Sequence, residues 1–177
     1  MALSKVDAVN FLTATIPSGN VANATLNAVT ALPGAIATGK VLQVVTATDN
    51  TTRSSTSSSF VTASNTLSVD ITPSATSSKI FVTTQFTVGC AADDQVATYT
   101  LNRDSTDLGD SGGEGMQRCA MYNAGYDAYF ICAMSILDSP SSTSALTYQV
   151  YGKTSKSSFY INYGAGLVSI TAYEIAG

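Results

Sequence analysis

Histidine is absent from this chain of 177 residues. Its absence excludes Ser-His-Asp and Cys-His catalysis, and it also excludes metal sites that are built on imidazole. The sequence contains neither a P-loop nor a GxGxxG motif, so the familiar phosphate-binding and dinucleotide-binding fingerprints are missing as well. We therefore expect a protein that is not an enzyme and that holds no cofactor and no metal.

Charged residues are scarce: they make up 11% of the chain, and the net charge is −4. This composition argues against a basic surface for nucleic acid or for an anionic membrane. No apolar run approaches the roughly 20 residues that span a bilayer, and the polar beginning of the chain lacks the apolar region of a signal peptide. We expect synthesis in a cytoplasm, with no nucleic-acid partner and no membrane insertion.

Cysteine is also rare, with three residues at Cys90, Cys119 and Cys132. An odd number without a secretion signal favours reduced thiols over a disulfide framework. Cys119 and Cys132 fall near opposite positions on two expected strands, which makes them candidate neighbours. The expected role of both is that of small buried hydrophobic residues.

Serine, threonine, asparagine and glycine replace the missing charge, which is typical of all-β proteins. The clearest pattern is the stretch 66–88, TLSVDITPSATSSKIFVTTQFTV, where apolar and polar residues alternate on both sides of Pro73. Alternation gives each strand one apolar face, and a proline among serines favours a turn. The stretch therefore predicts a strand, a turn and a second strand.

Similar patterns separated by turn signals continue to the C-terminus, and no helix is needed after residue 41. Strands are expected within 41–47, 60–63, 66–72, 80–88, 95–102, 115–122, 127–137, 143–154, 158–163 and 167–175, with one short strand also possible in the loop 104–115. The segments 115–122 and 127–137 are predicted to form a hairpin. Roughly nine strands at this spacing predict an antiparallel β-sandwich or a barrel.

Residues 1–40 differ from the rest, because they combine prolines, glycines and scattered apolar residues without a sustained period. A tail that only solvates the protein would carry more charge and fewer apolar residues. We therefore predict an extended N-terminal arm that docks on a partner, followed by a domain at 41–177; a flexible tail is the alternative. The candidate docking residues are Val6, Val9, Phe11, Leu12, Leu26 and Leu32.

The segment 127–137 breaks the usual alternation, because both of its faces are apolar. A strand of an antiparallel sandwich normally needs only one apolar face, and contiguous exposed apolar surface marks an interface. Tyr129, Ile131 and Ala133 lie on the second face, so we predict that they contact another subunit. The alternative is a central strand covered by a folded-back segment.

Two groups of polar residues are candidate sites. Tyr122, Asn123, Tyr126 and Asp127 crowd the tip of the expected hairpin, where they could contact a receptor sugar or instead pack on a neighbouring loop. Acidic residues gather in loops, where solvated side chains are expected; a glycosidase pair, or a Ca²⁺ site at 104–114, is the alternative. The acidic residues in loops are Asp93, Asp94, Asp104, Asp107, Asp110 and Glu114; Asp127, the remaining candidate for a glycosidase pair, begins the expected strand 127–137.

The beginning of the chain, MALSKVDAVNFLTATIPSGN, resembles that of bacteriophage fibre-type proteins, especially from phages of cyanobacteria. GKVLQVV (39–45), ITPSATSSKIFV (71–82) and DSPSSTSALTYQVYGKT (138–154) resemble the C-terminal β-domain of the same proteins. The usual glycine after Thr13 is Ala14 here, and the glycine-rich GGTG that often follows is missing. The resemblance implies a virion protein, often trimeric, with a jelly-roll-like β-domain.

Together these features predict a non-enzymatic, homotrimeric virion protein that decorates and stabilises a bacteriophage capsid through its N-terminal arm. Its partners would be itself and the major capsid protein or a tail protein. The short length, the missing shaft and the apolar arm favour this cement role. The segments that resemble fibre-type proteins favour the alternative, a short tail fibre that contacts the host surface and its polysaccharide. A soluble carbohydrate-binding β-domain is the second alternative.

Overall fold

The computed structural model describes residues 39–63, 66–90, 92–109, 112–121 and 128–177. These residues form eleven strands, and none of them forms a helix that could cross a membrane. The strands are β1 (Val41–Asp49), β2 (Arg53–Ser55), β3 (Ser68–Ile71), β4 (Lys79–Cys90), β5 (Gln95–Arg103), β6 (Thr106–Asp107), β7 (Gln117–Met121), β8 (Ala128–Asp138), β9 (Leu146–Thr154), β10 (Phe159–Ile161) and β11 (Val168–Ile175).

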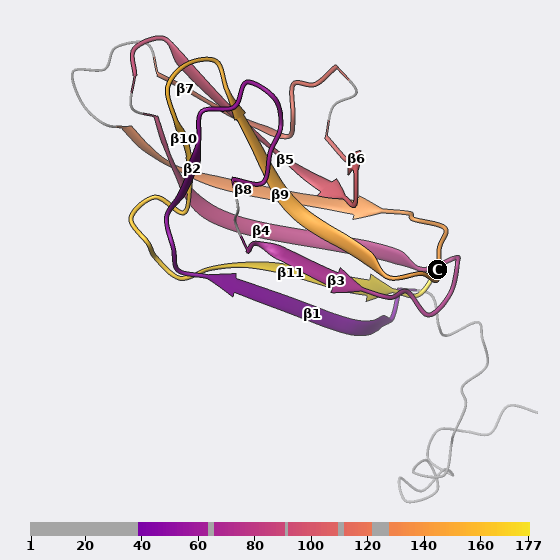
Figure 1. Ribbon diagram of the computed structural model, residues 1–177. Coiled ribbons are helices and arrows are strands. Elements are labelled where there is room, and N and C mark those ends of the chain that lie inside the picture. The colour runs from indigo at the N-terminus through magenta and orange to yellow at the C-terminus, as the bar shows by residue number, and fades with distance from the viewer. Residues whose placement is uncertain (1–38, 64–65, 91, 110–111, 122–127) are drawn as a thin grey trace, which may run out of the picture. The chain divides into compact units, whose positions relative to one another are not determined.

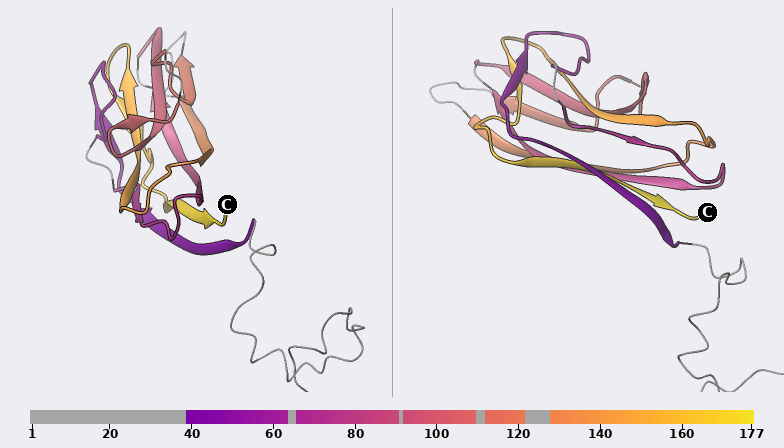
Figure 2. Two further views of the ribbon diagram at one scale, coloured as in Figure 1. Left: turned by 90° about the vertical axis from the view of Figure 1, so that its right-hand side faces the viewer. Right: turned by 60° about the horizontal axis from the view of Figure 1, so that its bottom comes forward.

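The strands lie in two antiparallel sheets that pack face to face (Figure 1). In sheet A, β1, β11, β4 and β8 follow one another, and the short strands β10 and β2 continue beside the end of β4. In sheet B, the order is β3, β9 and β5, with β6 and β7 both on the far side of β5. Two further views show β1 in indigo beside β11 in yellow (Figure 2).

The eight main strands pair in a nested order. β1 pairs with β11, β3 with β9, β4 with β8, and β5 with β7, and each pair is antiparallel. This order arises when one long antiparallel ribbon of paired strands is rolled up, so that successive pairs along the ribbon lie alternately in sheet A and sheet B. This arrangement is a jelly roll. The expectation of an all-β, jelly-roll-like sandwich is confirmed.

One strand pairing inferred from the sequence is wrong. The strand, turn and strand expected around Pro73 are present, as β3 and β4, and they lie in different sheets: β3 pairs with β9 in sheet B and β4 with strands of sheet A. The expected hairpin of 115–122 and 127–137 does not form, because β7 pairs with β5 and β8 with β4. Alternation shows which face a residue takes but not which strand is its neighbour, so a crossover between sheets resembles a hairpin.

Short elements differ from expectation as well. The predicted strand at 60–63 is reduced to one bridge between Val61 and Gly152. The short strand β2 lies between 47 and 60, where no strand was expected, whereas β6 confirms the short strand expected in the loop after β5. Strands of two or three residues bury too little surface to leave a periodic pattern.

The core lies between the sheets and follows the alternation on β4, where Ile80, Val82, Phe86 and Val88 are all buried as expected. Tyr99 of β5 is the central ring of the core. It meets Phe86 at 5.6 Å and Phe159 at 5.9 Å between ring centroids, both in edge-to-face geometry. Its hydroxyl donates to the carbonyl of Tyr160, so this buried polar group is satisfied.

Candidate assembly surface

The side of sheet A that faces away from sheet B carries a row of apolar side chains across four strands, which we call the apolar row. The row is fixed by strand register: Val44 of β1 pairs with Tyr173 of β11, Tyr173 with Phe81 of β4, and Phe81 with Leu137 of β8. The Phe81 and Tyr173 rings lie 6.0 Å apart, and Val44 and Leu137 are 54% and 52% exposed. A continuous apolar strip therefore crosses this face from β1 to β8.

The next row along the strands is polar. Thr46, Thr171, Thr83 and Ser135 occupy neighbouring positions on the same four strands, and the hydroxyls of Thr46 and Thr171 lie 3.0 Å apart. We call this set the hydroxyl row. It places short uncharged side chains beside the apolar row, which leaves that strip accessible to a partner.

A second apolar feature lies beyond the hydroxyl row. Ile131 of β8 and Leu167, just before β11, are 68% and 78% exposed. Both line an open pocket of about 370 Å³, together with Gln85 and Thr87 of β4. Two large apolar side chains therefore stand at a hollow that nothing in the described part of the chain fills.

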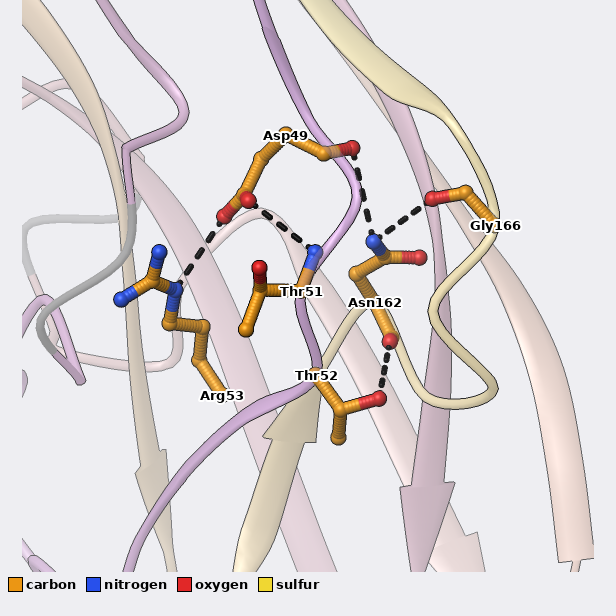
Figure 3. Close-up of polar contacts among 6 residues, drawn as sticks. All are labelled: Asp49, Thr51, Thr52, Arg53, Asn162 and Gly166. Carbon is orange, nitrogen blue, oxygen red and sulfur yellow. Dashed lines mark hydrogen bonds and ion pairs between the residues drawn. The ribbon is translucent and has the colours of Figure 1, made fainter.

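The loop that presents Leu167 is held in place by hydrogen bonds (Figure 3). The Asn162 amide donates to the carbonyls of Gly166, at 2.7 Å, and Asp49, at 3.5 Å, while the Thr52 hydroxyl donates to the Asn162 carbonyl at 2.8 Å. Asn162 has a φ of 58°, in the left-handed region that asparagine tolerates better than most residues. The β1–β2 turn thus fixes the position of Leu167.

Asp49 anchors the same turn. Its carboxylate accepts hydrogen bonds from the Thr51 backbone N–H at 3.0 Å and from Arg53 Nε at 3.2 Å (Figure 3). Burial alone would raise the pKa of Asp49, but these hydrogen bonds and the nearby guanidinium hold it below its usual value. The carboxylate therefore has a structural role: its hydrogen bonds hold the turn.

The structure places the predicted interface residues on this face. Tyr129, Ile131 and Ala133 are exposed on β8, which pairs with β4 along its whole length. The Tyr129 side chain already has a neighbour within the chain, because the centroid of its ring lies 4.8 Å from that of Tyr163. On the inward side of β8, Cys132 and Met134 are buried as the alternation predicts. Phe130 is an exception: it lies on that side but stays exposed, beside a small pocket at the sandwich edge.

Sequence reasoning missed the apolar row. Phe81 stands on the otherwise polar face of its strand, between Lys79 and Thr83, and this irregularity was the available signal. The partners Val44 and Tyr173 are 129 positions apart in the chain, so only the register of the sheet joins them. The row depends on tertiary structure that the local pattern does not contain.

The acidic loop does not assemble into a common site. Within the described residues, no group of three or more acidic, cysteine or histidine side chains is arranged to hold a metal ion. Asp110 lies outside the described residues. The other three carboxylates have separate partners: Asp104 accepts from the Thr147 backbone, Asp107 from the Thr100 hydroxyl and the Gly109 backbone, and Glu114 pairs with Arg118.

Two sets of predicted site residues lie outside the described residues, and the predictions for them stay predictions. One is the receptor-contact set, Tyr122, Asn123, Tyr126 and Asp127. The other is the docking set of the N-terminal arm, Val6, Val9, Phe11, Leu12, Leu26 and Leu32.

Comparisons with known proteins give structural likeness only. No family model matches the chain, and no curated protein sequence matches it. A VP2 subviral particle of infectious bursal disease virus is similar over 76% of this chain and 38% of that chain, with 17% identity and a TM-score of 0.38. The Gt strain of the same virus is similar over 77% and 39%, with 16% identity and a TM-score of 0.39. The chain therefore spans less than half the length of these viral proteins.

Proposed function

We propose that this protein is a non-enzymatic surface component of a bacteriophage particle, built to assemble with copies of itself. The observation that carries this proposal is the outer face of sheet A, with its apolar row and the exposed pair Ile131 and Leu167. Soluble monomers rarely expose contiguous apolar surface of this kind, and larger patches mark interaction sites.

The distribution of charge supports self-association. Among the described outward-facing positions of β1, β11, β4 and β8, Lys79 at the start of β4 is the only charged residue. Interface cores are depleted in charge, whereas freely solvated sheet faces commonly carry it. A second copy of the chain presents the same uncharged face and needs no complementary charge, which makes it a suitable partner.

Within this proposal the protein is a homotrimer that cements a capsid, and the N-terminal arm binds the major capsid protein. The arm supports this placement through its composition, since its apolar residues are separated by small ones and cannot form a core of their own. A short tail fibre that binds host polysaccharide is the second candidate. The resemblance of residues 39–45, 71–82 and 138–154 to fibre proteins favours it.

Deleting residues 1–38 is expected to leave a folded, self-associated protein that no longer binds virus particles. The deletion ends before Gly39, because the backbone of Gly39 donates to the carbonyl of Ala176 and belongs to the sandwich. Co-sedimentation of the full chain and the truncated chain with particles stripped of this protein measures the difference.

The same deletion tests the arm and the domain separately. If the truncated chain bound particles as strongly as the full chain, this result would contradict the role of the arm. Loss of the sandwich fold, seen by circular dichroism, would contradict the division of the chain into an arm and an independent domain.

A further inference from the structure

Two cysteines from different sheets meet at one end of the sandwich. Cys90 is the last residue of β4 in sheet A, and Cys119 lies in the middle of β7 in sheet B. Their sulfur atoms are 3.1 Å apart, and the residues are 2% and 6% exposed. Both side chains point into the space between the sheets, so the pair bridges sheet A and sheet B.

This contact differs from the one considered from the sequence, where Cys119 and Cys132 were candidate neighbours. Cys132 is buried on β8 and lines the same small pocket as Cys119, but the thiol that contacts Cys119 is that of Cys90. The difference follows from topology, because β7 pairs with β5 and does not form a hairpin with β8.

A route for a small oxidant leads to the pair. A pocket of about 160 Å³ beside β7 and β8 is lined by both Cys119 and Cys132, with Val88 and Phe130 beside them. Several water molecules fit in such a volume, and so does hydrogen peroxide, which is little larger than water. Cys119 is therefore the member of the pair that a small reagent reaches.

We infer that Cys90 and Cys119 are a site of oxidative modification, at which a peroxide closes an intramolecular disulfide between the two sheets. A disulfide needs a sulfur–sulfur distance of about 2.05 Å, so the two atoms must approach by about 1 Å. Inter-sheet disulfides of this kind occur in the sandwiches of antibody domains. The inference does not depend on the proposed function.

The reaction balances with one peroxide for each pair. Peroxide transfers one oxygen to the Cys119 thiol, which becomes a sulfenic acid as the O–O bond breaks and a water molecule leaves. The Cys90 sulfur then attacks the Cys119 sulfur, so that the S–S bond forms and the S–O bond breaks. The released hydroxyl takes the Cys90 proton and leaves as a second water. Two thiols are oxidised by two electrons, and the peroxide is reduced.

The cross-link is expected to stabilise the fold. Cys90 and Cys119 are 29 positions apart, so the bond closes a loop in the chain. Closing this loop lowers the conformational entropy of the unfolded state, which favours the folded state. It also ties β7, which pairs over only five residues with β5, to the central strand β4. We expect the melting temperature to rise by about 5 °C or more on oxidation.

The test uses the full chain, purified in reductant and then treated with a small excess of hydrogen peroxide. Free thiols are blocked by alkylation, and the protein is digested without reduction for peptide mapping by mass spectrometry. The expected result is one linked pair of peptides that contains Cys90 and Cys119, with Cys132 alkylated. Cys132→Ala should still form the link and gain in melting temperature, whereas Cys90→Ser should do neither.

Three outcomes would overturn the inference: a link between Cys119 and Cys132, sulfinic or sulfonic acid at Cys119 without a link, or three alkylated thiols after treatment. The peptide map of the unaltered chain decides among them, so the test stands even where a cysteine variant fails to fold.

Discussion

The substitution Ile131→Asp is expected to separate the assembled protein into folded monomers. Ile131 is 68% exposed in the single chain, so an aspartate there stays solvated in the monomer and leaves the fold intact. In the assembly the same carboxylate would be buried against an uncharged face without a partner, which is costly. We expect association to weaken at least tenfold, by about 1.4 kcal/mol or more, as measured by sedimentation equilibrium of the full chain.

A matched control separates this effect from that of added charge. Ser105 is exposed in the turn between β5 and β6 of sheet B, away from the outer face of sheet A, so Ser105→Asp should leave association unchanged. The substitution Leu167→Asp, on the other side of the pocket, should act like Ile131→Asp. A fully associated and folded Ile131→Asp protein would show that this face is not the interface.

The second large effect is expected at Glu174, a buried carboxylate that links β11 to two other segments. Its side chain accepts hydrogen bonds from the Ser74 backbone and hydroxyl at 2.7 and 2.6 Å, from the Ser78 hydroxyl at 2.7 Å and from the Gln43 amide at 2.7 Å. Burial alone would raise the pKa of Glu174, but these donors outweigh it and lower the pKa to about 2.

The substitution Glu174→Ala is therefore expected to lower the free energy of unfolding by about 3 kcal/mol at neutral pH, because it leaves buried donors without an acceptor. Urea denaturation measures this loss. Glu114→Ala is the control: Glu114 forms an exposed ion pair with Arg118, and such pairs contribute little. Equal unfolding free energies for the Glu174→Ala protein and the original chain would contradict the anchoring role.

The same carboxylate predicts how stability depends on pH. Because folding lowers the pKa of Glu174, the folded state binds this proton more weakly than the unfolded state does. Its contribution to stability is present above the usual glutamate pKa of about 4.3 and is lost as the pH falls towards 2. In the Glu174→Ala protein, the decrease in stability over this acidic range should be smaller than in the original chain.

Local patterns predicted much of this structure. Alternation placed Val82 and Phe86 in the core and Ile131 on the opposite face of its own strand, because the direction of a side chain on a strand depends only on its neighbours in sequence. The same rule places Glu174 among the inward residues of β11, beside Ala172. That signal was present in the sequence, and the carboxylate was nevertheless not predicted to be buried.

Features that depend on long-range pairing were not predicted. The apolar row requires Val44 to lie beside Tyr173, and the thiol pair requires β7 and β8 to separate into different sheets. Both follow from the order in which the ribbon rolls up, which alternation does not specify. Leu167 illustrates a third case, because hydrogen bonds around Asn162 hold the loop that presents it.

Immunogold labelling of intact virions, with an antibody raised against residues 41–177, tests the central claim most directly. The particles are those whose genome encodes this chain, and particles that lack the protein are the control. We predict gold distributed over the head at high density, as a capsid-cementing protein requires. Gold confined to the tail would still identify a virion protein, but it would identify a tail fibre and not a capsid-cementing protein. Absence of gold from every part of the particle would contradict the claim that this is a virion surface protein.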